Sequence, residues 1–236
     1  MLEQYKIDNI LFFDIETVPQ ERSFDDVPES LKGLWDKKSK YFRSDEESAG
    51  DVYQRAGIYA EFGKIVCISV GFIIVKGDER SLRVKSYAGH DEKVLLNDFA
   101  AMLNKNSRKF LCGHNIKEFD VPYIARRMLI NGITLPPSLN IAGKKPWEVN
   151  FIDTLELWKF GDFKHYTSLN LLTNIFNIPS PKDDIDGSQV AGVYYEEDDV
   201  ERIARYCEKD VLATTQLFLR FKGEPLIEQD KVESVG

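Results

Sequence analysis

The stretch FFDIETVP at residues 12–19 places two acids, Asp14 and Glu16, one residue apart at the end of a hydrophobic run. The run predicts a buried strand over residues 10–15, on which residues two apart share a face at a spacing of roughly 6.6–7 Å. Two carboxylates held side by side repel each other unless a cation lies between them, and oxygen ligands are the ones that Mg²⁺ and Mn²⁺ prefer. Taken alone, the triplet is explained better by an acid that faces solvent or caps the next segment.

The composition predicts a packed α/β domain, because 43% of the 236 residues are hydrophobic and 30% are charged. No apolar run approaches the roughly 18–20 residues that span a bilayer, and the N-terminus lacks the layout of a signal peptide. We therefore expect a cytoplasmic protein with no membrane partner. The three cysteines are far apart in apolar surroundings, which is typical of buried reduced thiols rather than of disulfides or a zinc site: Cys67, Cys112 and Cys207.

The formal net charge of −8 argues against a protein that coats nucleic acid, because such proteins gain affinity by neutralising phosphates with Lys and Arg. An enzyme that grips the end of a strand is compatible with this charge if bound cations supply local positive charge. Composition therefore leaves the function open.

The order of predicted elements is that of a mixed α/β sheet with one antiparallel strand and helices on both faces. We expect one domain over residues 1–222, a polar insertion at 20–62 with one or two short helices, and a loose tail at 223–236. The first strand is followed by a predicted hairpin, and a short strand enters a helix within residues 150–158. The remaining predicted elements are strands at 64–75, 81–88 and 109–113 and helices at 91–103, 119–129, 168–179 and 198–221.

A second polar constellation lies in GHNIKEFDVPYIARR, residues 113–127, where a buried strand runs through a loop into a helix. Asn115, Phe119 and Asp120 are its polar and aromatic positions. Asp120 has an ordinary explanation as the N-cap of the helix, which stabilises a helix by about 1 kcal/mol. Phe119 has one as a hydrophobic staple. We expect His114 to be a loop residue rather than a metal ligand, since no other histidine lies at ligand spacing.

A third constellation lies in RYCEKDVLATTQLF, residues 205–218, on the long C-terminal helix. Helical periodicity places Asp210 at the edge of the apolar stripe, and Tyr206 lies one turn earlier on the same side. An acid at the edge of a buried face needs a partner. By itself the pair favours a salt bridge from Asp210 to a basic residue and a tyrosine that only packs.

The three motifs in this order resemble the DEDD superfamily of 3′→5′ exonucleases. The segments FFDIET, HNIKEFDVPYIARR and YCEKD look most like stand-alone proteins related to the proofreading domain of family-B DNA polymerases. The similarity runs over residues 10–221 and implies an RNase H-like fold. The resemblance is to the tyrosine branch (DEDDy). The sister branch has a histidine shortly before its last acid, and this sequence has Arg205 and Tyr206 at the corresponding positions.

The resemblance implies a two-metal mechanism, in which two Mg²⁺ or Mn²⁺ ions about 3.5–4 Å apart serve an in-line displacement. Asp14 would bridge both ions, Glu16 and Asp210 would complete the ion that binds the attacking water, and Asp120 would hold the second ion through water. Tyr206 would orient that water. The product would be nucleoside 5′-monophosphates released one at a time.

The same resemblance implies a single-stranded DNA or RNA 3′ end as substrate, with DNA favoured, and a replication or repair protein as a further partner. Thr17 would meet the terminal 3′-hydroxyl through its backbone, while Asn115 and Phe119 would touch the terminal nucleotides. Ordinary loop and core roles explain Asn115 and Phe119 equally well. Five loop residues are further candidates for phosphate contacts: Lys117, Lys144, Lys145, Lys164 and His165. For Lys144 and Lys145, a solvated loop is the better explanation.

Two other functions fit parts of the pattern. A nucleic-acid-binding module of the same fold with weak catalysis would not need all four acids. An internally cutting nuclease of the RNase H or transposase kind does not use Tyr-x₃-Asp. The acidic segment at 180–189 lacks the ligand spacing of a calcium loop, so we expect a surface turn. The insertion at 20–62 is a candidate lid or partner surface.

Overall fold

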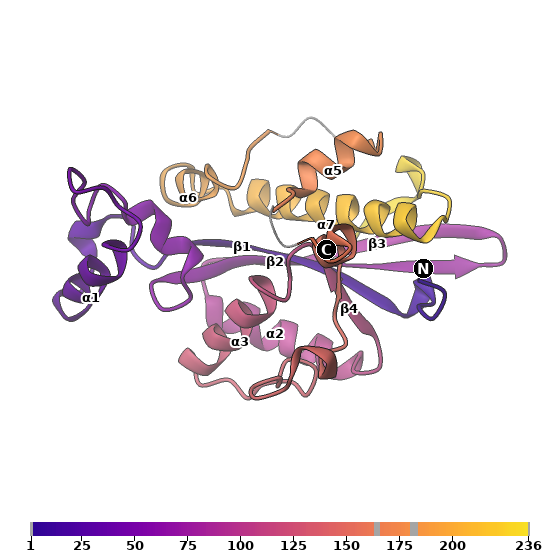
Figure 1. Cartoon of the computed structure of the whole chain (residues 1–236), viewed down its shortest axis with the longest axis horizontal. Helices are drawn as coiled ribbons and strands as arrows, with labels where there is room; N and C mark the ends of the chain where they lie inside the picture. The colour runs from indigo at the N-terminus through magenta and orange to yellow at the C-terminus, as the bar shows by residue number, and fades with distance from the viewer. Residues whose placement is uncertain (1, 163–165, 180–183, 236) are drawn as a thin grey trace.

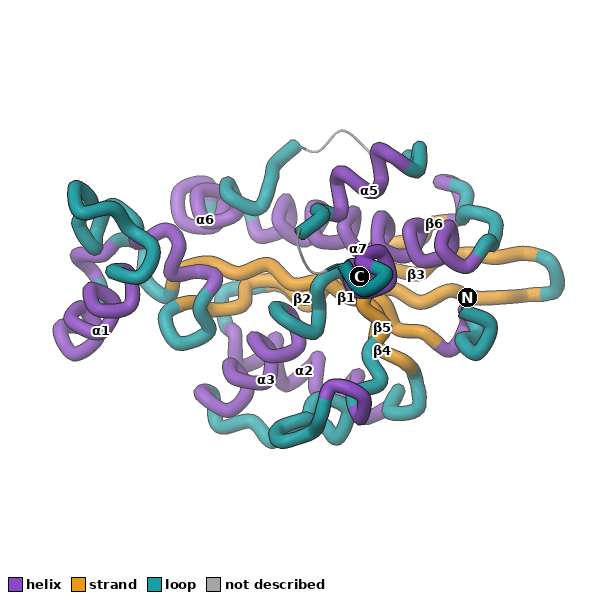
Figure 2. The backbone as a smooth tube through the Cα atoms, viewed as in Figure 1, coloured by secondary structure: helices purple, strands orange, loops and turns teal. Residues whose placement is uncertain are grey.

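The computed structural model describes residues 2–162, 166–179 and 184–235, and their centre is a six-stranded mixed sheet with the order β5-β4-β1-β2-β3-β6. β2 runs antiparallel to β1 and β3, and the other neighbouring pairs are parallel, as predicted. Figures 1 and 2 show helices above and below this sheet. The strands are β1 (Ile10–Pro19), β2 (Gly63–Lys76), β3 (Glu79–Ala88), β4 (Phe110–Gly113), β5 (Ile152–Asp153) and β6 (Val232–Ser234).

The predicted helices are present, with small changes at their ends. The helix expected at 168–179 is shorter, because the residue after Phe176, Asn177, adopts a left-handed backbone with φ 50°. The insertion holds one α-helix, and a π-helical turn (Val193–Glu197) precedes the last helix. The helices are α1 (Glu29–Ser39), α2 (Glu92–Lys105), α3 (Asp120–Ile130), α4 (Thr154–Lys159), α5 (Leu169–Ile175), α6 (Val190–Gly192) and α7 (Val200–Lys222).

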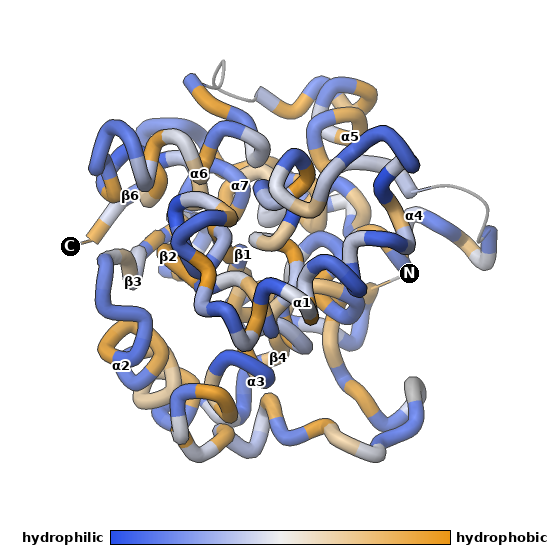
Figure 3. Tube along the Cα trace, turned by 90° about the vertical axis from the view of Figure 1, so that its left-hand side faces the viewer, coloured by the Kyte–Doolittle hydropathy of each residue, from blue (hydrophilic) through white to orange (hydrophobic). Residues whose placement is uncertain are grey.

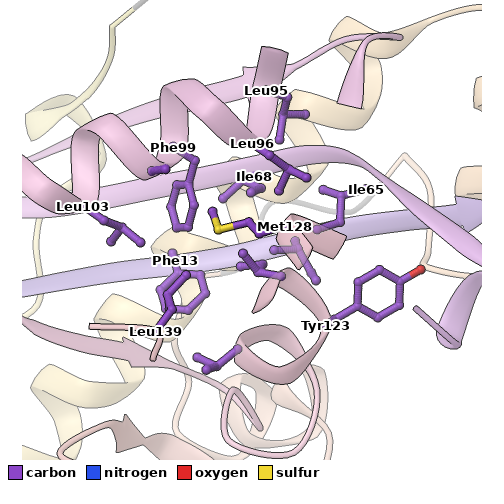
Figure 4. Packing of buried hydrophobic residues seen from close by; sticks show 14 of the residues in the cluster. Phe13, Ile65, Ile68, Leu95, Leu96, Phe99, Leu103, Tyr123, Met128 and Leu139 are labelled. Atoms are coloured by element: carbon purple, nitrogen blue, oxygen red, sulfur yellow. The ribbon is translucent and has the colours of Figure 1, made fainter. Parts of the chain in front are cut away.

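One face of the sheet packs against α2 and α3. The odd-numbered residues of the first strand, Leu11, Phe13 and Ile15, point into this core, where Phe13 lies 6.0 Å from the Phe99 ring of α2. Figure 4 shows the packing of α2 and α3 side chains around Phe13. Each buried side chain of this size contributes roughly 1.5–3 kcal/mol to stability.

The other face packs against α7, and the end-on view of Figure 3 places β1 and β2 between α7 and the pair α2 and α3. Phe12 meets Phe218 of α7 edge to face at 5.7 Å. Gly71 on β2 permits close approach, because a Cβ there would lie 2.7 Å from a methyl group of Val211. The even-numbered positions of β1, which include Asp14 and Glu16, therefore face α7.

The insertion at residues 20–62 has its own small core around Trp35, which is fully buried and donates a hydrogen bond to the carbonyl of Ala49 at 2.8 Å. It is tied to the sheet at its base, where Tyr123 of α3 donates to the carbonyl of Gly57 at 2.7 Å. Tyr195 donates to the carbonyls of Pro19 and Gln20 at 2.7 and 2.9 Å. The insertion is thus a packed extension at one end of the sheet (Figure 1).

The expectation of a loose tail from residue 223 is wrong for the described residues 223–235. β6 pairs in parallel with β3, and Ile227 is buried against α7. Gln216 of α7 exchanges two hydrogen bonds with the backbone of Ile227, at 2.6 and 2.9 Å. A three-residue strand has too little periodicity to stand out in a sequence, which is why the tail was not predicted to be ordered.

Among the described residues, no helix is both long and apolar enough to cross a membrane. All three thiols are buried and free, as the cysteine pattern predicted.

Candidate active site

Asp14 and Glu16 lie side by side on the α7 face of β1, as the two-residue spacing predicted. Glu16 is buried and Asp14 is half-buried. The thiol of Cys207 on α7 lies 3.4 Å from the backbone oxygen of Asp14 and 3.6 Å from its carboxylate. Ligand atoms of these three residues lie within 4.8 Å of one another, which is close enough to surround one cation.

Asp120 arrives from α3 through the tight β4–α3 loop. Gly113 is required there, because a Cβ would collide with the Ile116 side chain and come within 2.9 Å of the Phe13 carbonyl. The helix is capped by Phe119, and Asp120 is its first residue, buried with 3% exposure. The N-cap explanation of Asp120 is therefore wrong.

Asp153, at the end of β5, holds this loop in shape although the sequence drew no attention to it. Its carboxylate accepts hydrogen bonds from the backbone amides of Asn115 and Lys117, at 2.9 and 3.2 Å, and from that of Leu155 at 2.9 Å. These bonds stabilise the left-handed backbone of Asn115, whose φ is 63°. Only its position after a short strand could have suggested this role.

Tyr206 and Asp210 come from α7, one helical turn apart. The apolar stripe of that helix, which includes Cys207 and Val211, is fully buried against the sheet. Both polar side chains stand at the edge of the stripe, as predicted, and their side chains hydrogen-bond to each other. The helix begins at its cap Asp199, which accepts the amide of Arg202 at 2.8 Å.

All four acids and Tyr206 line one cavity of about 660 Å³, together with Asn115 and Phe119. Segments more than a hundred residues apart in the sequence thus meet at one point. The cavity is also lined by residues 184–187 and Gln189, part of the segment expected to be a surface turn, and by His114, Tyr166, Ser168, Asn170 and Thr173.

Burial and mutual repulsion perturb the acids strongly. Burial, followed by the charges of Asp120, Asp210 and Glu16, raises the pKa of Asp14 well above its usual value. Burial and the charge of Asp210 do the same to the pKa of Glu16. Burial raises the pKa of Asp120 to about 7, against hydrogen bonds from backbone amides. A divalent cation would relieve this repulsion, and the all-oxygen donor set fits Mg²⁺ or Mn²⁺.

Not every predicted contact lies at the cavity. Thr17 is half-buried, and its hydroxyl hydrogen-bonds Tyr123 on the α3 side, because the strand alternates and residue 17 shares the face of Phe13 and Ile15. Lys117 pairs with Glu156 at 2.5 Å, and Lys145 lies over the Trp147 ring. Lys144 lines a separate cavity of about 260 Å³. Lys164 and His165 lie outside the described residues.

His114 is a buried structural residue rather than a metal ligand. One ring nitrogen lies 2.9 Å from the Thr154 hydroxyl and the other 3.0 Å from the Thr167 carbonyl. Burial lowers the pKa of His114, so the ring stays neutral at neutral pH.

Two comparisons with known proteins bear on the family and the fold of this chain. The model of a family described as a predicted 3′→5′ exonuclease related to the exonuclease domain of PolB matches residues 58–230, which include Asp120, Tyr206 and Asp210. The family B DNA polymerase from the hyperthermophilic archaeon Pyrobaculum calidifontis superimposes with a TM-score of 0.54 at 19% identity. The match covers 89% of this chain and 24% of the polymerase chain, and it confirms the RNase H-like fold.

Proposed function

This chain belongs to the family of 3′→5′ exonucleases related to the exonuclease domain of PolB, and from that premise we propose that it degrades single-stranded nucleic acid from the 3′ end. The reaction is metal-dependent hydrolysis that releases nucleoside 5′-monophosphates, with DNA favoured over RNA. The observation that carries the proposal is the single cavity lined by Asp14, Glu16, Asp120, Asp210 and Tyr206.

The carboxylates of Asp14, Glu16, Asp120 and Asp210 would hold two divalent cations. Bound Mg²⁺ or Mn²⁺ would supply the positive charge that activates a water molecule and stabilises the leaving 3′-oxygen. The raised pKa values of Asp14 and Glu16 support this role, because they show that these carboxylates favour a bound positive charge. A divalent cation that binds there would displace the protons.

Tyr206 positions the attacking water. Burial and the neighbouring Asp210 raise the pKa of the phenol, so the hydroxyl keeps its proton at neutral pH. A protonated phenol can donate one hydrogen bond and accept another, but it cannot serve as a general base. We therefore assign Tyr206 the role of orienting the attacking water and not that of accepting its proton.

Asn115 and Phe119 contact the terminal nucleotides in this proposal, since both line the cavity beside the acids. Thr17 contributes through its backbone, which continues β1 past Glu16, and not through its hydroxyl. The strand end must be single-stranded to bring an unpaired base to these residues.

One exonuclease domain that extends past the expected end at residue 222 to include β6, with an insertion at 20–62, is part of the proposal. A cytoplasmic location and a replication or repair partner are part of it as well. The hydrogen bonds that tie the insertion to β1 and α3 favour a fixed partner surface over a mobile lid. Leu34 of the insertion is 55% exposed, so it is available to a partner.

The test uses 5′-labelled linear single-stranded DNA and RNA with Mg²⁺ or Mn²⁺. We expect a ladder that shortens from the 3′ end, disappears with chelator and is lost in Asp14→Asn. Circular single strands of the same sequence are the control. Cleavage of circles would show an internal nuclease, and binding of linear strands without cleavage under either metal would show the catalytically weak module instead.

A further inference from the structure

The cavity of the acids contains one exposed aromatic ring to which the motifs assign no role. Tyr166 lines it and is 64% exposed, whereas the other aromatic residues of the cavity, Phe119 and Tyr206, are half-buried. Its ring meets His114 edge to face, with centroids 6.2 Å apart and planes at 72°.

The His114 ring that Tyr166 packs against is held by hydrogen bonds. His114 is fixed through both ring nitrogens by the Thr154 hydroxyl and the carbonyl of Thr167, the residue next to Tyr166. Phe119 is supported similarly, with its ring 5.5 Å from that of Tyr123. The rings of Tyr166 and Phe119, each packed against another aromatic ring, thus border the same cavity from different segments.

The charge of the cavity limits how a strand can be bound there. Of the described residues that line it, six are acids and none is Lys or Arg. The described side chains that line the cavity therefore offer no cation to neutralise phosphates. Base stacking on aromatic rings is an uncharged contact that these side chains can provide to a strand end.

We infer that Tyr166 and Phe119 form a nucleobase subsite, in which the ring of Tyr166 stacks on an unpaired base at the 3′ end. The inference rests on the proposed function and adds the source of its single-strand selectivity. Stacking on a π-face tolerates any base but requires that base to be unpaired. The subsite thus accepts all four bases and rejects a paired terminus.

The experiment compares steady-state cleavage by wild type, Tyr166→Ala and Tyr166→Phe on oligonucleotides with a normal or an abasic 3′ end. Tyr166→Ala raises KM about 5- to 150-fold, the equivalent of about 1–3 kcal/mol of stacking, and changes kcat little. Tyr166→Phe keeps the wild-type KM. An abasic end weakens binding to wild type more than it weakens binding to Tyr166→Ala, in which only Phe119 of the subsite remains.

Tyr41→Ala is the matched control, since it removes an exposed tyrosine from the insertion, outside the cavity. Thermal melting shows whether each variant folds. An unchanged KM in Tyr166→Ala, a loss in Tyr166→Phe equal to that in Tyr166→Ala, or additive effects of the variant and the abasic end would overturn the inference.

Binding is also measured without turnover, through the fluorescence of a 3′-terminal 2-aminopurine that is quenched when it stacks. We expect wild type and Tyr166→Phe to quench it and Tyr166→Ala to quench much less. This readout separates the two proposals, because quenching without any cleavage removes the exonuclease but keeps the subsite. Absence of quenching by wild type removes the subsite whatever the cleavage assay shows.

Discussion

Two buried groups of charged side chains lie on opposite sides of this sheet: one is an ion pair, and in the other several carboxylates raise one another's pKa values. Between α2, α3 and the insertion, Glu92 and Arg127 are 8% and 5% exposed and form an ion pair at 2.6 Å. Glu92 also accepts hydrogen bonds from the Ile65 amide and from Asn131, at 2.7 and 2.9 Å. Arg127 donates to the Ala60 carbonyl at 2.9 Å.

On the α7 side, Asp14, Glu16, Asp120 and Asp210 face one another, and no described Lys or Arg lines their cavity. Besides burial, the charges of Asp120 and Asp210 raise the pKa values of Asp14 and Glu16. Burial of charge is thus common to both groups, and the mutual repulsion among Asp14, Glu16 and Asp120 distinguishes the site from the structural pair.

The largest expected effect is on catalysis. Asp14→Asn and Asp210→Asn should each lower the cleavage rate at least about 10²–10³-fold, the usual cost of removing one preorganised electrostatic group. Initial rates on 5′-labelled single-stranded DNA measure this. Glu201→Gln is the control, because Glu201 is a 93% exposed acid on the same helix. Equal rates in Asp14→Asn and wild type would remove Asp14 from the site.

Breaking the ion pair between Glu92 and Arg127 should lower stability rather than the cleavage rate. Arg127→Met leaves Glu92 buried without a counter-charge and should cost about 3–5 kcal/mol of unfolding free energy. Urea denaturation measures the loss, and the double variant Glu92→Leu/Arg127→Met should recover part of it. A loss below about 1 kcal/mol in the single variant would mean that water or another group compensates Glu92.

The pH dependence of metal-free stability should run opposite to that of an acid in a salt bridge. The pKa of Asp120 is about 7 when folded and near 3.8 when unfolded, so the folded state holds the extra proton between these values. The stability that protonated Asp120 contributes to the fold is therefore lost as the pH rises from about 4 through 7.

Asp120→Asn should remove this loss, so its stability relative to wild type should increase between pH 4 and pH 8 by on the order of 2–4 kcal/mol. Denaturation in chelator at both pH values measures the change. Asp230→Asn, which replaces an exposed acid of the C-terminal segment, is the control. A difference that stays flat with pH would show that Asp120 is ionised in the metal-free fold.

The smallest effect concerns the tie between the insertion and the sheet. Tyr195→Phe removes the hydroxyl that bonds the carbonyls of Pro19 and Gln20, and it should cost about 0.5–1.5 kcal/mol. Thermal melting measures the loss. A cleavage rate that falls as well would show that this tie also positions the end of β1.

The sequence predicted the parts of the site that depend on local periodicity. Asp14 and Glu16 share a face because a strand alternates, and Tyr206 and Asp210 share an edge because a helix repeats every 3.6 residues. It did not predict Asp153 or Tyr166, whose roles depend on which loops the fold brings together. The ordered tail was missed for the same reason, since β6 is defined by its pairing with β3 and not by its own residues.

The central claim is that the carboxylates of Asp14, Glu16, Asp120 and Asp210 form a divalent-metal site, and calorimetric titration of Mn²⁺ tests it most directly. At pH 7, in two buffers of different ionisation enthalpy, wild type should bind Mn²⁺ and release protons, because the cations displace protons from acids of raised pKa. Asp14→Asn should bind much more weakly, and Glu201→Gln should bind as wild type does. Absence of Mn²⁺ binding by wild type, or equal binding by Asp14→Asn, would contradict the claim.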